Sequence, residues 1–162
     1  MAARHQSNLL TVGARAPEFC LARLDGGEAT LQDLLANAPV LLAFFKISCP
    51  VCQMTLPYLD RVHTPGRLSV YAVSQNDEQD TRDFHKHFRI ALPTLLDSEE
   101  NAFPLSNAFG ISSVPTMFLI ERDGTVSRVI EGWVKQDIEA LAGLAGVGLF
   151  QEGERLPAWK PG

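Results

Sequence analysis

Apolar and polar positions alternate along the chain in a pattern that predicts short strands and helices in turn. Two apolar segments, 39–45 and 68–74, have the length of sheet strands, and the first is continuous enough to be buried on both faces. Helical spacing of apolar residues follows each of them. Two more apolar segments flank Asp123-Gly124, a pair typical of a hairpin turn. The remaining expected elements are strands at 18–24 and 92–96 and helices at 31–37, 101–109 and 135–145.

The order of these elements predicts an α/β fold with a central mixed sheet and helices on both faces. The sequence contains neither an internal repeat nor a linker long enough to divide domains. We therefore expect a single domain over 1–162, with 1–13 as a flexible lead-in. Residues 152–162 are rich in proline and glycine and are expected to form a surface tail.

Two helix starts carry capping residues. Thr30 is expected to cap the helix at 31–37, with Asp33 in its first turn. Asn76 with Gln79 resembles a capping pair for the predicted helix that follows the apolar segment 68–74. Pro57 lies inside the helix that follows the first buried strand and is expected to kink it.

Charge and composition exclude some function classes. A formal net charge of -5 argues against a broad nucleic-acid surface. The longest apolar run, 40–45, is far shorter than the roughly 20 residues of a membrane-spanning helix. The first twelve residues lack the apolar stretch of a secretory signal, which favours a cytoplasmic location, or a periplasmic or extracytoplasmic one if a signal segment has been removed.

Two of the three cysteines, Cys49 and Cys52, lie three residues apart at a predicted strand-to-helix junction. Pro50 fits the first turn of that helix. A thiol at a helix N-terminus is expected to have a lowered pKa, because unpaired N–H groups and the helix dipole favour the thiolate. Cys49 would attack a disulfide and Cys52 would resolve the mixed disulfide, while Pro50 and Val51 set the stiffness of the loop.

Other interpretations of the cysteines stay open. The pair could be half of a zinc site, but a matching second half is missing, and His85 and His87 are two residues apart. It could also be two inert, packed thiols. Cys20 is either a packed strand residue or a regulatory thiol. We expect neither a metal nor another cofactor besides a redox-active disulfide between Cys49 and Cys52.

Several motifs together resemble the thioredoxin superfamily. From Gly13 to about Ala145 the chain is similar to its TlpA-like and ResA-like branch, which is related to the AhpC/TSA proteins. The matching motifs are Gly-Ala-Arg-Ala-Pro-Glu-Phe at 13–19, the strand leading into Cys49-Pro50-Val51-Cys52, Pro57 and Val114-Pro115-Thr116. The resemblance implies a thioredoxin-like fold with an N-terminal extension and a helix–strand insertion at 77–96.

The same resemblance implies a substrate-binding loop around the cysteines. Pro115 would be cis and would pack against the pair, and the backbone of Val114 would pair with a substrate strand. Ser48, Pro50 and Val51 would border the reactive thiol. The alternative is a trans proline that starts an edge strand.

The chain departs from the family pattern at several positions. Ser48 stands where the family usually has Trp, and Ala43 stands where small thioredoxins have a buried acid. The residues after Cys52 include no nearby acid either, so the resemblance supplies no proton acceptor for that thiol. Lys46 could stabilise the Cys49 thiolate, or it could be a solvated residue at the end of a strand.

These observations predict a thiol–disulfide oxidoreductase with protein disulfides or dithiols as substrates and a separate reductant or oxidant that recycles it. A peroxiredoxin-like thiol peroxidase is the first alternative, although Lys46 occupies the position where such enzymes usually have Thr or Ser. A redox-inactive binding module that offers the groove beside Pro115 to peptides is the second.

Overall fold

The computed structural model describes residues 8–162 and is built on a five-stranded sheet. The strand order is β5-β4-β3-β6-β7, in which β3, β4 and β5 are parallel while β6 and β7 are antiparallel to their neighbours. This confirms the predicted mixed sheet. The strands are β3 (Val40–Phe45), β4 (Ser69–Ser74), β5 (Thr94–Leu96), β6 (Thr116–Ile120) and β7 (Val126–Glu131).

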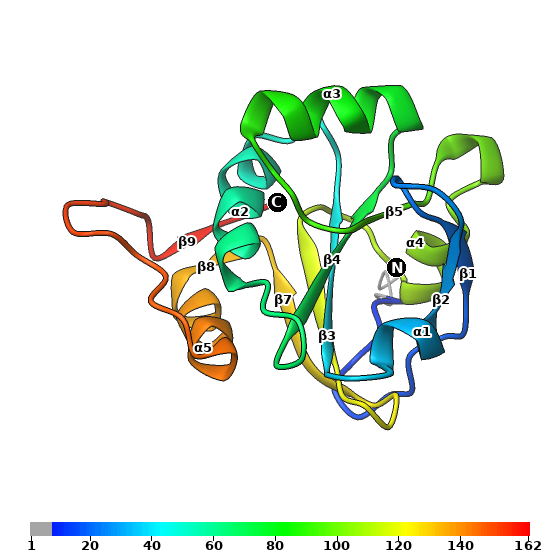
Figure 1. Cartoon of the computed structure of the whole chain (residues 1–162), viewed down its shortest axis with the longest axis horizontal. Coiled ribbons are helices and arrows are strands. Elements are labelled where there is room, and N and C mark those ends of the chain that lie inside the picture. Colours follow the sequence, from blue (N-terminus) through cyan, green and yellow to red (C-terminus); the bar gives the residue numbers. More distant parts are fainter. Residues whose placement is uncertain (1–7) are drawn as a thin grey trace, which may run out of the picture.

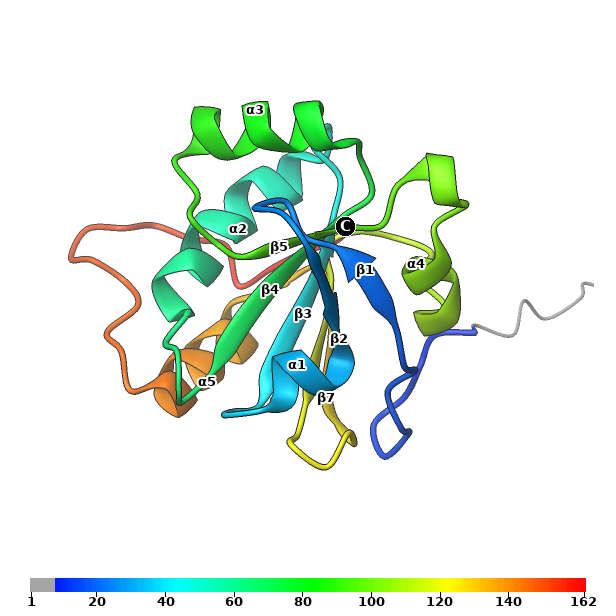
Figure 2. The same cartoon turned by 45° about the vertical axis from the view of Figure 1, so that its right-hand side comes forward.

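Helices cover both faces of the sheet, as predicted. Figure 1 shows α2 and α5 on one side of it, α1 and α4 on the other, and α3 along the top. The helices are α1 (Leu31–Leu35), α2 (Pro50–Val62), α3 (Glu78–Phe88), α4 (Pro104–Phe109) and α5 (Lys135–Ala145), with a 3-10 turn at Glu99–Asn101. Two small ribbons complete the fold: β1 (Cys20–Ala22) with β2 (Glu28–Thr30), and β8 (Trp133–Val134) with β9 (Trp159–Lys160). Figure 2 shows β1, β2 and α1 in front of the sheet.

Strand β3 forms the centre of the core, and all six of its side chains are fully buried. Because successive side chains of a strand point to opposite faces, Phe44 and Phe45 start two separate aromatic clusters. Phe44 packs against Phe109 and Phe118, with ring centroids 5.3 and 5.9 Å away. Phe45 packs against Phe84 of α3 at 5.2 Å. The chain leaving β3 is therefore fixed from both faces.

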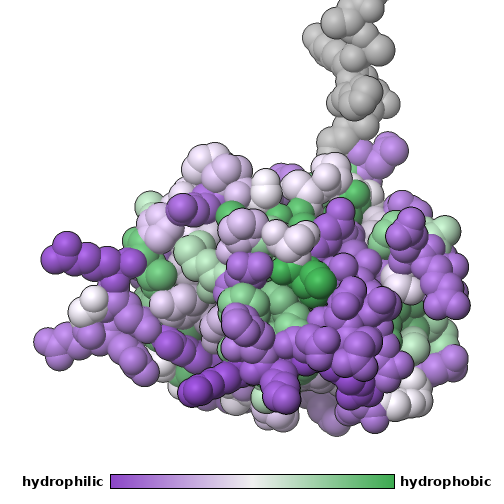
Figure 3. Space-filling view, turned by 90° about the horizontal axis from the view of Figure 1, so that it is seen from above, coloured by the Kyte–Doolittle hydropathy of each residue, from purple (hydrophilic) through white to green (hydrophobic). Residues whose placement is uncertain are grey.

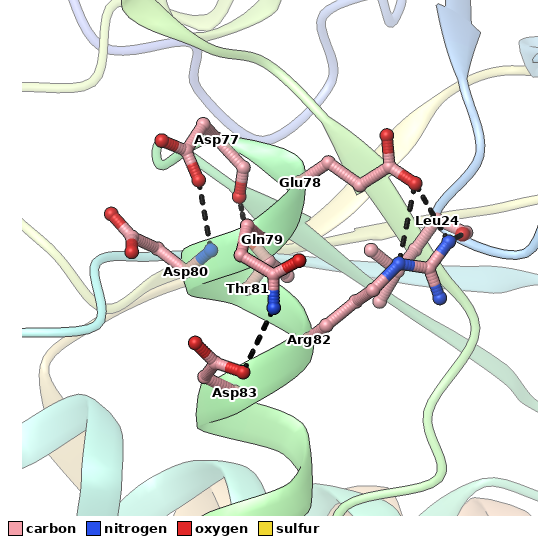
Figure 4. Close-up of polar contacts among 8 residues, drawn as sticks. All are labelled: Leu24, Asp77, Glu78, Gln79, Asp80, Thr81, Arg82 and Asp83. Atoms are coloured by element: carbon pink, nitrogen blue, oxygen red, sulfur yellow. Dashed lines mark hydrogen bonds and ion pairs between the residues drawn. The ribbon is translucent and has the colours of Figure 1, made fainter.

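Local capping explains where two helices begin. Thr30 caps α1 as predicted: its hydroxyl oxygen accepts the Asp33 N–H. The Asp33 carboxylate accepts the Thr30 N–H in turn, which completes a capping box. The prediction for α3 was wrong by one residue. Its cap is Asp77, whose carboxylate accepts the Asp80 N–H at 2.8 Å (Figure 4), whereas Asn76 lies before the helix and binds elsewhere.

The helix–strand insertion is tied to the rest of the fold through Arg82. Its guanidinium donates to Glu78 at 2.7 Å and to the carbonyl of Leu24, which follows β1 (Figure 4). Gln79 donates to Asp83 further along the same helix. Arg82 thus holds the start of α3 against the β1–β2 ribbon.

Strand and helix periodicity decides which of several neighbouring side chains are buried at three places. Cys20 is exposed, because Leu21 points into the core and adjacent strand residues face opposite ways. Leu144 is also exposed, so Ala145 is the residue that faces the core at the end of α5. Met54 is only half-buried, while Cys52, Leu56 and Leu59 form the buried face of α2.

The two ends of the described chain are held by hydrogen bonds. The expected lead-in lies outside the described residues for 1–7, but its remainder is bonded: Leu10 N–H donates to Phe109 O, and Gly13 N–H donates to Val126 O. The tail is exposed over most of its length and contributes β9. The single-domain division stays a prediction. Among residues 8–162, no helix has the length and apolar character needed to cross a membrane.

Candidate active site around Cys49 and Cys52

The reactive pair lies where β3 ends and α2 begins. Cys49 is the N-cap of α2 and Pro50 is its first residue, a position that needs no backbone N–H. The Sγ of Cys49 accepts the Cys52 N–H at 3.1 Å, so the thiol takes the role that a carboxylate or hydroxyl usually has at a helix start. The first turn of α2 contains no acidic residue. A thiolate at Cys49 would therefore face free N–H groups without a competing negative charge.

Cys52 lies one turn further along and is fully buried. Burial raises the pKa of its thiol strongly, and the hydrogen bond with Cys49 raises it further, against a smaller opposing effect of the Lys46 backbone. The groups that shift this pKa include no carboxylate. Cys52 therefore stays a neutral thiol at physiological pH until a base removes its proton.

The loop before β6 approaches the pair from the opposite side. The Val114–Pro115 peptide bond is cis, the isomer that the resemblance implied. The Cys49 thiol donates to the Val114 carbonyl at 3.4 Å, and Gly132 N–H donates to the Pro115 carbonyl at 2.8 Å. Both Val114 and Pro115 are buried. The reactive sulfur is thus held between the start of α2 and this loop.

Side chains that the sequence did not single out fix the loop before Cys49. Asn76 accepts the Ile47 N–H at 3.0 Å through its side-chain oxygen, and Gln53 donates to the Ile47 carbonyl at 2.9 Å. Asn76 follows β4, the parallel neighbour of β3, and the ends of parallel strands meet at one edge of a sheet. That topology is the signal that could have identified Asn76. Together, Asn76 and Gln53 position Cys49 through the backbone.

The other predicted site residues lie around the thiol at the surface. Ser48 and Pro50 are exposed, and Val51 is half-buried. Viewed from above, the molecule shows apolar side chains in the middle with polar side chains around them (Figure 3). Cys20 is not brought to the site, since its thiol donates to Glu28 within the β1–β2 ribbon. Across residues 8–162, no three His, Cys, Asp or Glu side chains are grouped so that they could hold a metal ion.

A small cavity of about 190 Å³ opens beside Val114 and Lys46. Ser106 lines this cavity and belongs to a buried polar network. In it, Asp97 accepts from the backbone N–H groups of Leu105 and Ser106 and from the Ser106 hydroxyl. Gln75 in turn donates to the Ser106 oxygen at 2.8 Å. The network fixes α4 relative to the ends of β4 and β5, which Gln75 and Asp97 follow.

Known proteins with similar sequences or structures carry out thiol chemistry. The chain is 28% identical over 139 residues to the thiol-disulfide oxidoreductase ResA of Geobacillus thermodenitrificans, which covers 83% of this chain and 78% of ResA. Its structure is similar to that of a putative thiol:disulfide interchange protein DsbE from Chlorobium tepidum, with a TM-score of 0.71, 25% identity and coverage of 83% and 95% of the two chains.

A peroxidoxin has the same fold. The structure of BcpB from Mycobacterium tuberculosis has a TM-score of 0.70 at 20% identity and covers 85% of this chain and 97% of that one. The structural comparisons confirm the thioredoxin-like fold. In sequence, the pattern of the AhpC/TSA family matches residues 12–129, a region that holds both cysteines and the Val114–Pro115 loop. This match over most of the chain shows that the protein belongs to the AhpC/TSA family, and its relatives place it with the ResA-like branch of the thioredoxin superfamily.

Proposed function

We propose that this protein is a thiol–disulfide oxidoreductase that exchanges electrons with protein disulfides through Cys49 and Cys52. The observation that carries the proposal is the position of the Cys49 sulfur. It lies at the N-terminus of α2, accepts a backbone N–H, and is held beside the buried thiol of Cys52. An accessible nucleophile next to a buried resolving thiol is the arrangement that disulfide exchange requires.

In the first step, the Cys49 thiolate attacks one sulfur of a substrate disulfide. A bond forms between Cys49 and that sulfur, the substrate S–S bond breaks, and the second substrate sulfur leaves as a thiolate that takes a proton from solvent. The backbone N–H of Cys52 stabilises the negative charge on Cys49 before the attack. The absence of acids from the first turn of α2 preserves this stabilisation.

In the second step, Cys52 loses its proton and attacks the Cys49 sulfur of the mixed disulfide. The Cys49–Cys52 disulfide forms, the substrate is released as a thiol, and two electrons have passed from the protein to the substrate. Because burial raises the pKa of Cys52, deprotonation limits this step. We assign the proton to solvent base, since no carboxylate contributes to that pKa.

The loop at Val114 and Pro115 supports a polypeptide substrate. The Val114 carbonyl lies 3.4 Å from the Cys49 sulfur, so a substrate strand that pairs with the Val114 backbone would bring its disulfide to the nucleophile. Ser48, Pro50 and Val51 border the same position. The recycling reductant or oxidant and the location, cytoplasmic or extracytoplasmic, stay predictions.

Redox titration tests the proposal. The protein is equilibrated in glutathione buffers of graded potential, and the Cys49–Cys52 disulfide is followed by mass after alkylation. A midpoint near about -270 mV would make the protein a reductant, and one near about -120 mV an oxidant. A pair that forms no disulfide at any potential would overturn the proposal and favour the redox-inactive binding module.

The peroxidase alternative draws on family membership and on the fold of the peroxidoxin. Lys46, three residues before Cys49, is exposed and cannot supply the hydroxyl that peroxiredoxins usually have there. Dilute hydrogen peroxide distinguishes the two functions. Rapid formation of sulfenic acid at Cys49, faster than its reaction with disulfides, would favour the peroxidase.

A further inference from the structure

The C-terminal segment 157–162 returns to the active site after leaving α5. In Figures 1 and 2 the end of the chain is marked at the upper part of the sheet, below α3. We infer that residues 159–162 occupy the backbone position beside Val114 where a substrate strand would pair, and that they must move away before a polypeptide substrate can reach Cys49. This inference rests on the proposed function, because it concerns access of the substrate to the same thiol.

The contact at Val114 is made by Gly162. A Cβ placed on Gly162 would lie 2.8 Å from the carbonyl carbon of Val114 and closer still to its oxygen, and 3.3 Å from the nitrogen of Pro115. The same Val114 oxygen accepts a hydrogen bond from the thiol of Cys49. The backbone of residue 162 therefore lies against the group with which a substrate strand would pair.

Gly132 gives a second, independent contact between the segment and the active-site loop. Its N–H donates to the Pro115 carbonyl. A Cβ on Gly132 would lie 3.1 Å from the nitrogen of Gly162 and would overlap the carbonyl oxygen of Lys160. The segment thus runs across Gly132 before it reaches Val114, and any side chain at position 132 would push it away.

The segment is tethered at its start and exposed at its end. Trp133 donates its indole N–H to the Pro157 carbonyl at 2.7 Å, and Lys135 N–H donates to the Ala158 carbonyl at 2.9 Å. Beyond these bonds only the two-residue pairing of β9 with β8 is regular, and Trp159 is 61% exposed. A short exposed ladder with little buried apolar surface opens at low cost, so the end can leave while the start stays bound.

Competition between the segment and the substrate should depend on substrate size. A protein disulfide needs an extended backbone beside Val114, which is the place that residue 162 holds. A small aromatic disulfide needs only the sulfur of Cys49. The closed segment then lowers the apparent affinity for a protein substrate in proportion to the fraction of molecules that are closed.

The test compares two glycine-to-leucine variants of the full chain. Gly162→Leu adds a side chain that cannot fit against Val114, whereas Gly148→Leu adds the same side chain in open space and serves as the matched control. With reduced protein and insulin as the disulfide substrate, Gly162→Leu is expected to raise kcat/KM about three- to tenfold. The reaction with dithiodipyridine should change much less, and Gly148→Leu should match the parent in both reactions.

A second measurement does not depend on disulfide exchange. Alkylation of Cys49 by a maleimide attached to a large polymer should be faster in Gly162→Leu than in the parent, while alkylation by iodoacetamide should be nearly equal. Equal rates of Gly162→Leu and parent with insulin and with the polymer would overturn the inference, and slower insulin reduction would mean that the segment helps to bind substrate. If neither the parent nor Gly162→Leu exchanged disulfides, while polymer alkylation was still faster in the variant, the proposed function would be refuted and the covering role of the segment would be supported.

Discussion

Helices α2 and α3 begin at the same edge of the sheet, each after one of two neighbouring parallel strands, yet their first turns have opposite chemistry. α3 is capped by the carboxylate of Asp77, and Glu78 and Asp80 follow in its first turn (Figure 4). α2 is capped by the thiol of Cys49, and its first turn contains no acid. The two starts are bridged by Asn76, which precedes Asp77 and binds the loop before Cys49.

The difference separates stability from reactivity. At α3 the carboxylate of Asp77 accepts from a free N–H group and interacts favourably with the helix dipole, so this cap stabilises the folded state. At α2 the charge exists only when Cys49 is a thiolate, so the same N–H groups favour the reactive form. Two helix starts at equivalent positions in the topology can therefore differ in function, one in stability and one in reactivity, because of the identity of the capping residue.

The strongest way to break the comparison is to remove the sulfur from the α2 cap. Cys49→Ser keeps a preferred N-cap, so the fold should be retained, but exchange with protein disulfides should fall at least about a hundredfold because the nucleophile is lost. Insulin reduction measures the rate, and circular dichroism checks the fold. Cys52→Ser is the companion variant, which should still attack but accumulate mixed disulfides. Full activity in Cys49→Ser would exclude Cys49 as the nucleophile.

The second prediction concerns pH. Because the pKa of Cys52 is raised, its thiolate fraction at neutral pH is small and should grow about tenfold per pH unit below that pKa. Release of substrate from a preformed mixed disulfide at Cys49 should therefore accelerate steadily from pH 6 to pH 9. Stopped-flow measurement gives the slope, and release by added dithiothreitol from Cys52→Ser is the control. A flat profile would show that a group of the protein takes the proton.

The third prediction makes α2 resemble α3. Val51→Glu places an acid in the first turn of α2, where it should disfavour the Cys49 thiolate and slow the attack on a disulfide about three- to tenfold at pH 7. Val51→Gln has nearly the same shape without the charge and should react close to the parent rate. The gap between the two variants should shrink at high salt because mobile ions screen exposed charges. A gap that is unaffected by salt would argue against an electrostatic cause.

The fourth prediction weakens the bridge between the two helix starts. Asn76→Ala leaves the Ile47 N–H without its acceptor and should cost about 1 kcal/mol of unfolding free energy. The looser loop should slow exchange about two- to fivefold, because the position of Cys49 is less well defined. Asn76→Asp keeps an acceptor oxygen and should recover most of both losses. Urea unfolding and insulin reduction measure the two effects, and normal values for Asn76→Ala would remove Asn76 from the positioning of the loop.

The smallest effect on activity is expected at the α3 cap. Asp77→Ala should lower the unfolding free energy by about 1 kcal/mol and leave the exchange rate unchanged, since Asp77 caps α3 and not α2. Asp77→Ser retains a capping oxygen and should restore stability. A parallel loss of exchange in Asp77→Ala would show that the two helix starts are coupled more closely than the single Asn76 bond indicates.

Local patterns in the sequence predicted those elements whose residues lie close together along the chain. The continuous apolar run ending at Phe45, the cap at Thr30 and the helix at 135–145 depend on spacings of two to four residues. The position of Cys49 at the start of a helix could be predicted for the same reason, because it depends on residues close by in the sequence. The cap of α3 was mispredicted, because Asn76 and Asp77 are both good caps and a distant partner, Ile47, selected between them.

The sequence by itself thus determined the order of strands and helices, the mixed α/β sheet and the junction that carries the two cysteines. Only the tertiary structure decided that Asn76 supports the loop, that Cys20 faces solvent, that Asp97 is buried beneath α4, and that Gly162 lies against Val114. The physical reason is sequence separation. Periodicity and capping act between near neighbours, whereas these contacts join residues that strand order and register bring together.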